Sequence, residues 1–354
     1  MIDEDFWRGK RVFVTGHTGF KGSWLSIWLH SLGAQVHGYA LAPPTTPSLF
    51  EQARVSELVE GELGDVCNAV DLTRSLAAFQ PDIVLHMAAQ PLVRASYQNP
   101  VETYATNVMG TVHLLEAARH VPTVRAVVVV TTDKCYENRE WEWGYRECEP
   151  MGGHDPYSNS KGCAELVTDA YRRSFFADTN IAVGSARAGN VIGGGDWAED
   201  RLIPDILKAF QEGRPAIVRN PNAIRPWQHV LEPLSGYLLL AETLYKQGHE
   251  AARAWNFGPH DDGARPVDWI AGCMSDLWGE GASWQLMADS PQPHEATYLK
   301  LDISRARTYL HWSPTWTLQE TLERIVNWQR AWLGGSSAQQ LCLDEIAHFH
   351  RSRL

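Results

Sequence analysis

The sequence predicts an α/β fold, in which a Rossmann-type doubly wound parallel sheet is followed by a smaller C-terminal mixed α/β substrate domain. Short apolar runs alternate with helical patterns over the first two thirds of the chain, and each run is apolar throughout. Such runs are typical of parallel strands that are covered by helices on both faces. A glycine-rich segment, Gly16–Gly22, also stands between the first run and the first helical pattern.

The elements are predicted from apolar runs, from the 3.6-residue helical period and from flanking turn residues. Before residue 190 the predicted strands are 11–16, 34–41, 83–88, 126–131 and 181–185, and the predicted helices are 21–32, 101–120 and 157–175. After it, shorter segments follow at 202–211, 216–219, 231–245, 267–278 and 318–332. We therefore expect a first domain over 1–190, to which some later segments return, a second domain over 191–334, and a C-terminal tail over 335–354 with a loosely attached helix.

The composition excludes several classes of protein. Against 31 Lys and Arg stand 42 Asp and Glu, so the formal charge of −11 disfavours general binding to nucleic acid or to anionic membranes. The N-terminus is acidic, and the apolar runs are far shorter than a membrane span. The six cysteines show no CxxC or CxxH spacing, so they are expected to be reduced thiols, and no metal site is predicted. These features predict a soluble, cytoplasmic protein.

The glycine-rich segment has the spacing GxxGxxG at Gly16, Gly19 and Gly22. Glycines at such a turn allow a pyrophosphate to approach the backbone at a helix N-terminus, so the segment predicts a dinucleotide site. A ribose-binding acid is expected at the end of the second strand, but 38–42 holds neither an acid nor an arginine, which leaves NAD and NADP both open. Asp65 is either a ligand of the adenine amino group or an exposed loop residue.

Two short motifs carry candidate chemistry. Tyr157 and Lys161 are four residues apart at the start of a helix, where the ammonium group would favour the phenolate. At the end of the strand 126–131, Thr132 could bind a sugar hydroxyl, Asp133 could be a general acid and Lys134 a general base. Carboxyl ends of parallel strands are where such sheets place their ligands. A helix-surface pair and a solvated strand-end pair are the alternative interpretations.

These segments resemble the extended short-chain dehydrogenase/reductase superfamily, through 15–22, 86–90, Asn107, the Tyr157/Lys161 pair and 187–191. More narrowly, the chain is similar to the CDP-glucose group of the sugar-nucleotide 4,6-dehydratases. The stretches that carry this closer match are 19–24, 43–50, 131–136, 193–197, 225–230 and 291–296. A lysine at the position of Lys134 is the pattern of the CDP-glucose group, and it also occurs in inverting UDP-N-acetylglucosamine 4,6-dehydratases. Most other sugar-nucleotide 4,6-dehydratases have Glu at this position.

The resemblance implies a retained NAD, oxidation at the sugar C4, loss of water across C5 and C6, and return of the hydride to C6. The catalytic residues that it implies are Thr132, Asp133, Lys134, Tyr157 and Lys161. The implied cofactor-binding residues are Gly16, Gly19, Phe20, Lys21, Gly22, Asp65, Val66, Ala88, Tyr157 and Lys161. The implied substrate-binding residues are Asn190, Arg201, Arg219 and Arg225 for the diphosphate, and Gln90 and Arg94 for the hexose.

Other interpretations of the same motifs stay open. Another sugar-nucleotide 4,6-dehydratase, acting on UDP-N-acetylglucosamine or dTDP-glucose, would use the same residues. A 4-epimerase or 4-reductase would need only Tyr157 and Lys161, and an NAD-sensing binding protein would need no catalysis. The resemblance further implies a homodimer or a dimer of dimers through the helices at 101–120 and 157–175, and a place in deoxysugar biosynthesis for lipopolysaccharide O-antigen.

Overall fold

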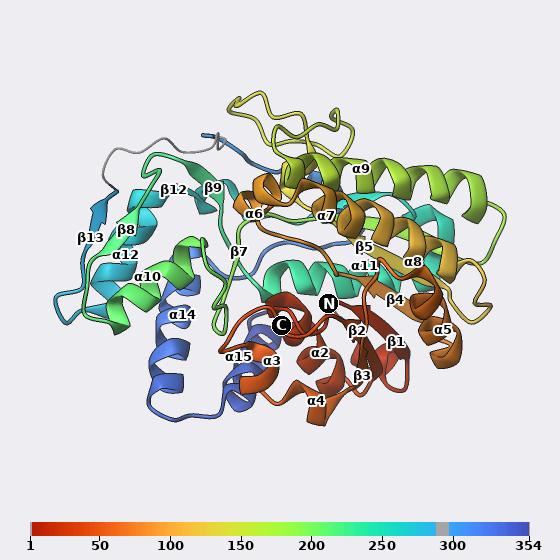
Figure 1. Ribbon diagram of the computed structural model, residues 1–354, viewed down its shortest axis with the longest axis horizontal. Helices are drawn as coiled ribbons and strands as arrows, with labels where there is room; N and C mark the ends of the chain where they lie inside the picture. The colour runs from red at the N-terminus through yellow and green to blue at the C-terminus, as the bar shows by residue number, and fades with distance from the viewer. Residues whose placement is uncertain (1, 288–296, 354) are drawn as a thin grey trace.

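The computed structural model describes residues 2–287 and 297–353. Its centre is a parallel sheet of seven strands in the order β11-β6-β5-β4-β1-β2-β3 (Figure 1). The order reverses between β1 (Arg11–Thr15) and β4 (Ile83–His86), whose register pairs Val12 with Ile83. Ligands of doubly wound sheets bind at such a reversal, beyond the carboxyl ends of the strands. The doubly wound parallel sheet predicted from the sequence is confirmed.

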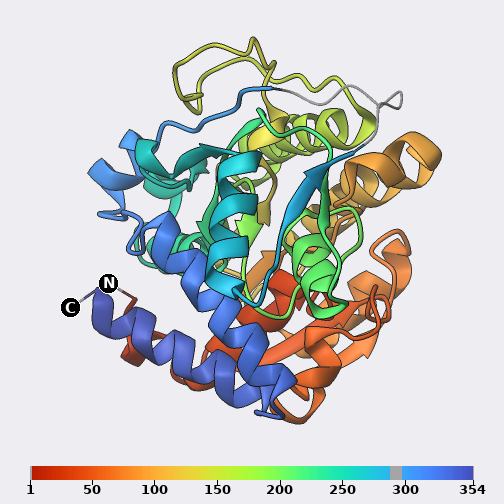
Figure 2. The same ribbon diagram turned by 90° about the vertical axis from the view of Figure 1, so that its left-hand side faces the viewer.

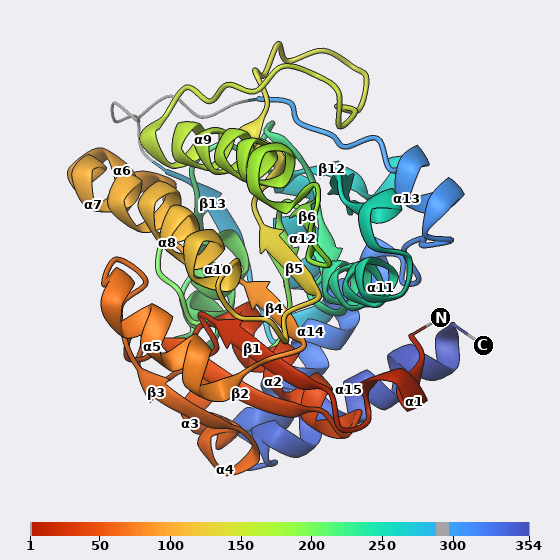
Figure 3. The same cartoon turned by 90° about the vertical axis from the view of Figure 1, so that its right-hand side faces the viewer.

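The inner strands of this sheet are buried because their side chains alternate between two cores, whereas the edge strand β3 (Glu60–Leu63) is largely exposed. In β5 (Ala126–Val130), Val128 packs into the core that contains Trp24 and Leu238, whereas Val127 and Val129 pack into the opposite core. A run of five apolar residues is therefore needed to satisfy both faces of one strand. Figure 3 shows the resulting layers, with α8 and α9 on one face of the sheet and α11 on the other.

The first 190 residues supply six of the seven strands and most of the covering helices. Its remaining strands are β2 (Gln35–Ala40), β3 (Glu60–Leu63) and β6 (Ala182–Arg187). Its helices are α1 (Glu4–Trp7), α2 (Phe20–Ser31), α3 (Leu49–Gln52), α4 (Val55–Leu58), α5 (Ala69–Phe79), α6 (Val93–Gln98), α7 (Pro100–Tyr104), α8 (Gly110–Ala118) and α9 (Pro156–Tyr171).

Two helices predicted as single units contain π-helical turns. The segment predicted at 101–120 consists of α7, the π-helical turn η1 (Ala105–Met109) and α8, and α9 continues into the π-helical turn η3 (Arg172–Phe176). Such turns are frequent at functional sites, and η1 carries the buried Asn107. The amide of Asn107 bonds the backbone of Gln90 and donates to Ser160 Oγ, so this turn joins α9 to the loop after β4.

The second half forms a small mixed domain and also returns to the central sheet (Figure 2). Its short strands are β7 (Val191–Ile192), β8 (Ala216–Val218), β9 (Ile224–Pro226), β10 (Gln228–His229), β12 (Ala264–Pro266) and β13 (Trp284–Leu286). Its helices are α10 (Leu202–Gln211), α12 (Val267–Trp278), α13 (Ser304–Tyr309) and α14 (Leu318–Leu333). In contrast, β11 (Ala254–Asn256) pairs with β6, and the apolar side of α11 (Leu231–Gln247) packs in the same core as β5.

The C-terminal helix α15 (Ala338–Ser352) differs from the loosely attached helix expected from the sequence. Cys342 and Phe349 are fully buried, and the indole of Trp28 on α2 donates to His350 Nε2 at 2.8 Å. A helix with an apolar stripe gains most of its stability from packing, so this tail is a structural part of the dinucleotide-binding half.

Two smaller findings complete the fold. All six cysteines are free thiols, as the sequence predicts. Within 2–287 and 297–353, no helix has the length and apolar character needed to cross a lipid bilayer. The predicted match at 291–296 lies outside the described residues.

Candidate active site

The glycine-rich turn leaves the end of β1 and enters α2 with no room for side chains. Gly16 has a φ of +78°, and a β-carbon there would lie 2.8 Å from Ala88 N. A β-carbon on Gly22 would overlap the carbonyl oxygen of Gly16. The three segments around β1, α2 and β4 therefore approach each other through backbone alone, as close binding of a pyrophosphate requires.

Gly19 is the N-cap of α2, and no side chain caps this end of the helix. The first amides of the helix, which include those of Phe20 and Lys21, are thus left for an anion at the positive end of the helix dipole. A partly exposed helix N-terminus of this kind fits the pyrophosphate of NAD.

A histidine ring packs against the second strand, after which the sequence holds no ribose-binding acid. The ring of His17 lies on Gly38, where any β-carbon would overlap it, and reaches toward Gly61 on β3. Burial lowers the pKa of His17 to about 4, with repulsion from His37 as a second cause, so the ring is neutral. The exposed Asp65 accepts a hydrogen bond from the Cys67 amide through Oδ1, and the neighbouring Val66 is buried.

The strand ends at the reversal of the sheet are joined by one hydroxyl group. Thr15 Oγ1 accepts hydrogen bonds from the amides of Met87 and Ala88, each at 3.1 Å, and contacts His86 Nδ1 at 2.8 Å. Burial lowers the pKa of His86 to about 3, with Lys161 as a further cause, so this imidazole is neutral. The hydrogen bond from the Ala88 amide to Thr15 Oγ1 holds the backbone of Ala88 beside Gly16.

Helix α9 presents Tyr157 and Lys161 to the carboxyl end of β5. Asp155 caps the helix by accepting from the Ser158 amide at 2.9 Å, which sets the position of its first turn. Lys161 is 6% exposed and donates to the carbonyl oxygen of Val130 at 3.2 Å. Burial lowers its pKa to about 8, while the carboxylate of Glu165 acts in the opposite direction.

Tyr157 lies in the same buried region and is protonated at neutral pH. Burial raises its pKa to about 12, whereas a hydrogen bond with Thr132 and the charge of Arg201 act to lower it. A bound nicotinamide cation would add a further positive charge, which favours the phenolate. The structure therefore brings the predicted Tyr157, Lys161 and Thr132 together.

The turn after β5 is a 3₁₀-helix, η2 (Asp133–Cys135), and it is capped by Thr132. Thr132 Oγ1 donates to Asp133 Oδ1 at 2.9 Å, and the Asp133 side chain lies against Gly189. The other carboxyl oxygen, Oδ2, is buried and has no hydrogen-bond partner in the described part of the chain. Lys134 is partly exposed beside it. A carboxyl oxygen held in this way suits a proton donor to a substrate oxygen.

Lys21 belongs to the same group of side chains, although the sequence suggested only a cofactor contact for it. Its ammonium donates to the Tyr237 hydroxyl at 3.0 Å. Burial lowers the pKa of Lys21 to about 7, and the charges of Lys161 and Arg201 lower it further. Tyr237, on α11, gave no signal in the sequence beyond a position in an apolar helix.

Sequence reasoning also missed a buried ion pair beneath the catalytic residues. Glu165, one helical turn after Lys161, is 4% exposed and forms a 2.7 Å ion pair with Arg187. It also accepts from Thr131 Oγ1 and from Ser185 Oγ. The spacing 157-161-165 marks one face of α9, and this was the signal that could have identified Glu165.

The residues predicted to bind the diphosphate differ in their surroundings. Asn190 has a buried Oδ1 without a partner in the described residues, which suits a ligand contact. Arg201 is paired with Asp196 at 2.9 Å, and Arg225 is 3% exposed on β9 and donates to the Ile224 carbonyl. Arg219 is ion-paired with Asp200 at 2.5 Å.

The two residues predicted for the hexose differ from each other. Gln90 uses both ends of its amide within its own segment, because it donates to Thr103 Oγ1 and accepts from the Leu92 amide. Its side chain therefore shapes the loop after β4 in this conformation. Arg94, on α6, contacts the carboxylate of Asp200 at 3.7 Å.

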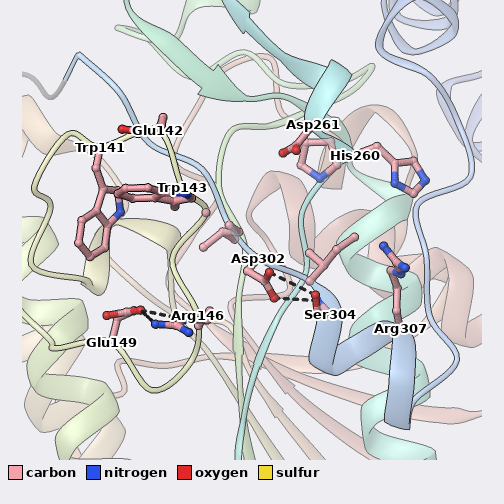
Figure 4. A pocket seen from close by; sticks show the side chains of 14 residues that line it. Trp141, Glu142, Trp143, Arg146, Glu149, His260, Asp261, Asp302, Ser304 and Arg307 are labelled. Atoms are coloured by element: carbon pink, nitrogen blue, oxygen red, sulfur yellow. Dashed lines mark hydrogen bonds and ion pairs between the residues drawn. The ribbon is translucent and has the colours of Figure 1, made fainter.

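A cavity of about 810 Å³ lies between the loop 141–149, the segment 259–261 and the start of α13 (Figure 4). Two tryptophans, Trp141 and Trp143, form one wall, and the ion pair of Arg146 with Glu149 lies below them. Its lining includes none of the predicted catalytic or cofactor-binding residues, so it is separate from the group around Tyr157.

Comparison with known proteins identifies the family of the chain. Residues 13–325 match the family model described as GDP-mannose 4,6 dehydratase. The chain is 61% identical to the CDP-glucose 4,6-dehydratase of Salmonella typhimurium, over 99% of this chain and 98% of that protein. It is 26% identical to the dTDP-glucose 4,6-dehydratase of the same organism, over 91% and 93% of the two chains.

A solved structure has the same fold at lower identity. The dTDP-glucose 4,6-dehydratase DesIV of Streptomyces venezuelae, solved with NAD and TYD bound, has a TM-score of 0.78 at 24% identity, over 93% of this chain and 99% of that one. The family model spans most of the chain and one relative matches it along its whole length. The chain therefore belongs to the sugar-nucleotide 4,6-dehydratases of the extended short-chain dehydrogenase/reductase superfamily, in the group of the CDP-glucose 4,6-dehydratases.

Proposed function

We propose that this chain is a lyase that converts CDP-D-glucose to CDP-4-keto-6-deoxy-D-glucose and water, with NAD as its cofactor. One observation carries the proposal. Thr132 donates to Asp133 and is close enough to Tyr157 to lower its pKa, so the residues proposed for oxidation and those proposed for dehydration meet at the carboxyl end of one strand. A 4-epimerase needs only the first set, and the 61% identical relative is named for the dehydration.

The turn at Gly16–Gly22 would hold NAD, whose chemistry when bound is the transfer of a hydride from the sugar C4 and later to C6. This turn has no space for a side chain at Gly16 or Gly22, and no side chain caps the helix end at Gly19. Asp65 and Val66 would border the adenine, and Ala88 would lie beside the pyrophosphate. Tyr157 and Lys161 would face the nicotinamide half, where a carbinol must be oxidised.

The proton transfers follow from the side chains on either side of Thr132. Tyr157 would remove the proton of the C4 hydroxyl, and the Lys161 ammonium would stabilise the phenolate. The resulting 4-ketone acidifies the hydrogen at C5, which a neutral Lys134 would remove. Asp133 would protonate the C6 hydroxyl as the C6–O bond breaks and water leaves. After the hydride arrives at C6, the proton on Lys134 returns to C5.

The diphosphate needs local positive charge because the protein as a whole carries −11. Arg201, Arg219 and Arg225 would supply it, and the Nδ2 amide of Asn190 would donate a hydrogen bond to it. Arg94 would reach the hexose. Gln90 would support this part of the site through the loop that it holds, with its own side chain bonded to Thr103 and Leu92.

The same helices that carry the active site support a homodimer. Val101, Met109, Leu166 and Phe175, on α7, η1, α9 and η3, are 81%, 46%, 60% and 47% exposed. Exposed apolar side chains on adjacent helices indicate an interface, and a two-fold pair would place them in a four-helix contact. A cytoplasmic location and a role in deoxysugar biosynthesis for O-antigen stay predictions from the sequence.

The proposal is tested with four substrates, each deuterated at the hexose C4: CDP-glucose, dTDP-glucose, UDP-N-acetylglucosamine and GDP-mannose. The purified protein receives each with catalytic NAD, and the products are identified by NMR. We expect a 4-keto-6-deoxy product with deuterium at C6 from CDP-glucose alone. Turnover of another nucleotide would keep the chemistry and discard the cytidine assignment. A C4 epimer without loss of water would replace the dehydratase by an epimerase.

A further inference from the structure

One carboxylate oxygen holds two arginines that belong to different halves of the molecule. Asp200 Oδ1 lies 2.5 Å from Arg219 Nη1 and 3.7 Å from Arg94 Nη1. Arg94 is on α6, just after β4 of the central sheet, whereas Arg219 directly follows β8 of the small domain. Asp200 therefore bridges the two halves through a single atom.

This bridge lies at the edge of the catalytic group. Asp200 immediately precedes Arg201, whose charge acts on both Tyr157 and Lys21. The segment before it is anchored, because Asp196 is 8% exposed and pairs with Arg201 at 2.9 Å. Asp200 itself has a φ of +62°, in the left-handed region that non-glycine residues seldom adopt. In this backbone conformation the Asp200 carboxylate lies beside Arg94 and Arg219.

The arginines are the groups that a sugar nucleotide requires. A diphosphate presents two negative charges with oxygens suited to guanidinium donors, and the Asp200 carboxylate presents one. A second acid, Asp205, lies 3.8 Å from Arg219. Burial raises the pKa of Asp205 to about 6, and the charge of Asp200 is among the further causes. Arg219 is therefore already surrounded by protein anions.

We propose that Asp200 is an internal competitor of the substrate diphosphate: it holds Arg94 and Arg219 in place across the site and must give up Arg219 when a nucleoside diphosphate binds. This inference rests on the proposed function only for the identity of the ligand. In mechanistic terms, Asp200 is a positioning and specificity residue, because a ligand with a single or distant charge displaces it less well than a diphosphate does. It also limits how tightly the product is retained.

The expected effect is moderate because the side chains are partly exposed. Asp200 and Arg219 are 45% and 25% exposed, and solvent screens such pairs. Removing the carboxylate charge should tighten binding of a nucleoside diphosphate by about fivefold, within the range known for exposed ion pairs. The gain should diminish as salt is added.

The experiment measures the Kd of CDP, and in parallel of UDP, by calorimetry on the NAD-loaded protein. Asp200→Asn is compared with Glu199→Gln, which removes the adjacent exposed charge without touching either arginine. We expect Asp200→Asn to bind the preferred nucleotide about fivefold more tightly and Glu199→Gln to stay within twofold of the parent. In an Arg219→Gln background, the gain from Asp200→Asn should shrink to less than twofold.

Three results would overturn the inference. Equal effects of Asp200→Asn and Glu199→Gln would mean that only general charge repulsion is at work. Weaker binding by Asp200→Asn would make Asp200 a ligand of the substrate and not its competitor, and a full gain in the Arg219→Gln background would remove the link to Arg219. Turnover of CDP-glucose is measured separately, so a protein without dehydratase activity could still confirm or contradict the role of Asp200.

Discussion

The carboxyl group of Asp133 lies against the α-carbon of Gly189, so closely that a β-carbon on Gly189 would overlap it. The two residues are at the carboxyl ends of neighbouring strands, β5 and β6. A glycine is therefore needed at 189 for a reason of space, because φ is not in the left-handed region there. The contact fixes the position of the Asp133 carboxyl group, which we propose as the acid of the dehydration step.

Gly189→Ala tests this relationship. The added methyl group displaces the Asp133 carboxyl, and a shift of about 1 Å in a catalytic group can reduce turnover by about 100-fold. Formation of the 4-keto-6-deoxy product should fall by that order, while C4 oxidation, read from the absorbance of reduced cofactor, continues. Gly272→Ala on α12, where a β-carbon meets no atom within 4 Å, should retain full activity. Unchanged product formation in Gly189→Ala would show that Asp133 is not the acid.

Tyr157→Phe removes the proposed base of the oxidation step. Without the phenolic oxygen, no group in the pocket takes the proton of the C4 hydroxyl, so no reduced cofactor should appear, even transiently. Stopped-flow absorbance measures it after rapid mixing with CDP-glucose. Tyr309→Phe, at an exposed tyrosine of α13, should behave as the parent. Transient reduced cofactor in Tyr157→Phe would assign the base to another residue.

Lys134→Met separates oxidation from dehydration. The variant keeps Tyr157 and Lys161, so it should still oxidise C4, but it has no amine to remove the C5 proton. NMR in D₂O should show no exchange at C5 and no loss of water. Lys208→Met, at an exposed position of α10, is the matched control. Normal exchange at C5 in Lys134→Met would move the base elsewhere.

Glu165→Gln tests the buried pair beneath Lys161. Burial lowers the pKa of Lys161 to about 8, and the Glu165 carboxylate opposes this effect by raising the pKa. Below that pKa the ammonium is present, and above it the charge on Lys161 is lost. Without Glu165 the pKa falls further, so the decline of kcat at alkaline pH should begin at a lower pH than in the parent.

Breaking a buried pair also costs about 3 kcal/mol of stability, so the pH profile of kcat is read below the melting transition. Glu323→Gln, at an exposed position on α14, is the control for both measurements. A lower Tm with an unchanged pH profile would restrict Glu165 to a structural role.

Glu232→Gln should change how stability depends on pH. Glu232 is 1% exposed and accepts from the amides of Thr315 and Trp316, but burial raises its pKa from 4.5 to about 7. Between these values the unfolded chain loses the proton and the folded protein keeps it, so the parent loses stability as pH rises. The loss is on the order of 3 kcal/mol. Gln stays neutral, so urea titrations of the variant should show a smaller decrease between pH 5 and pH 8; an equal decrease would contradict the assignment.

Features formed by residues close together in the sequence could be predicted, whereas contacts between residues far apart in the chain could not. Gly16–Gly22, the Tyr157/Lys161 pair and the run Ala126–Val130 are local patterns, and local backbone preferences and periodicity suffice to interpret them. The attachment of α15 was not predicted because Phe349 packs against Trp28 and Trp316, which precede it in the chain by more than 300 and by more than 30 residues, respectively.

The sequence by itself determined the doubly wound sheet, the glycine-rich turn proposed to bind the dinucleotide and the set of candidate catalytic side chains, because each consists of residues that are adjacent or one helical period apart. Only the tertiary structure decided which polar groups meet across segments. It paired Glu165 with Arg187, turned the amide of Gln90 into its own loop, and placed Asp200 between Arg94 and Arg219. Such contacts depend on how whole strands and helices pack, and side chains far apart in the chain carry no local signal of that packing.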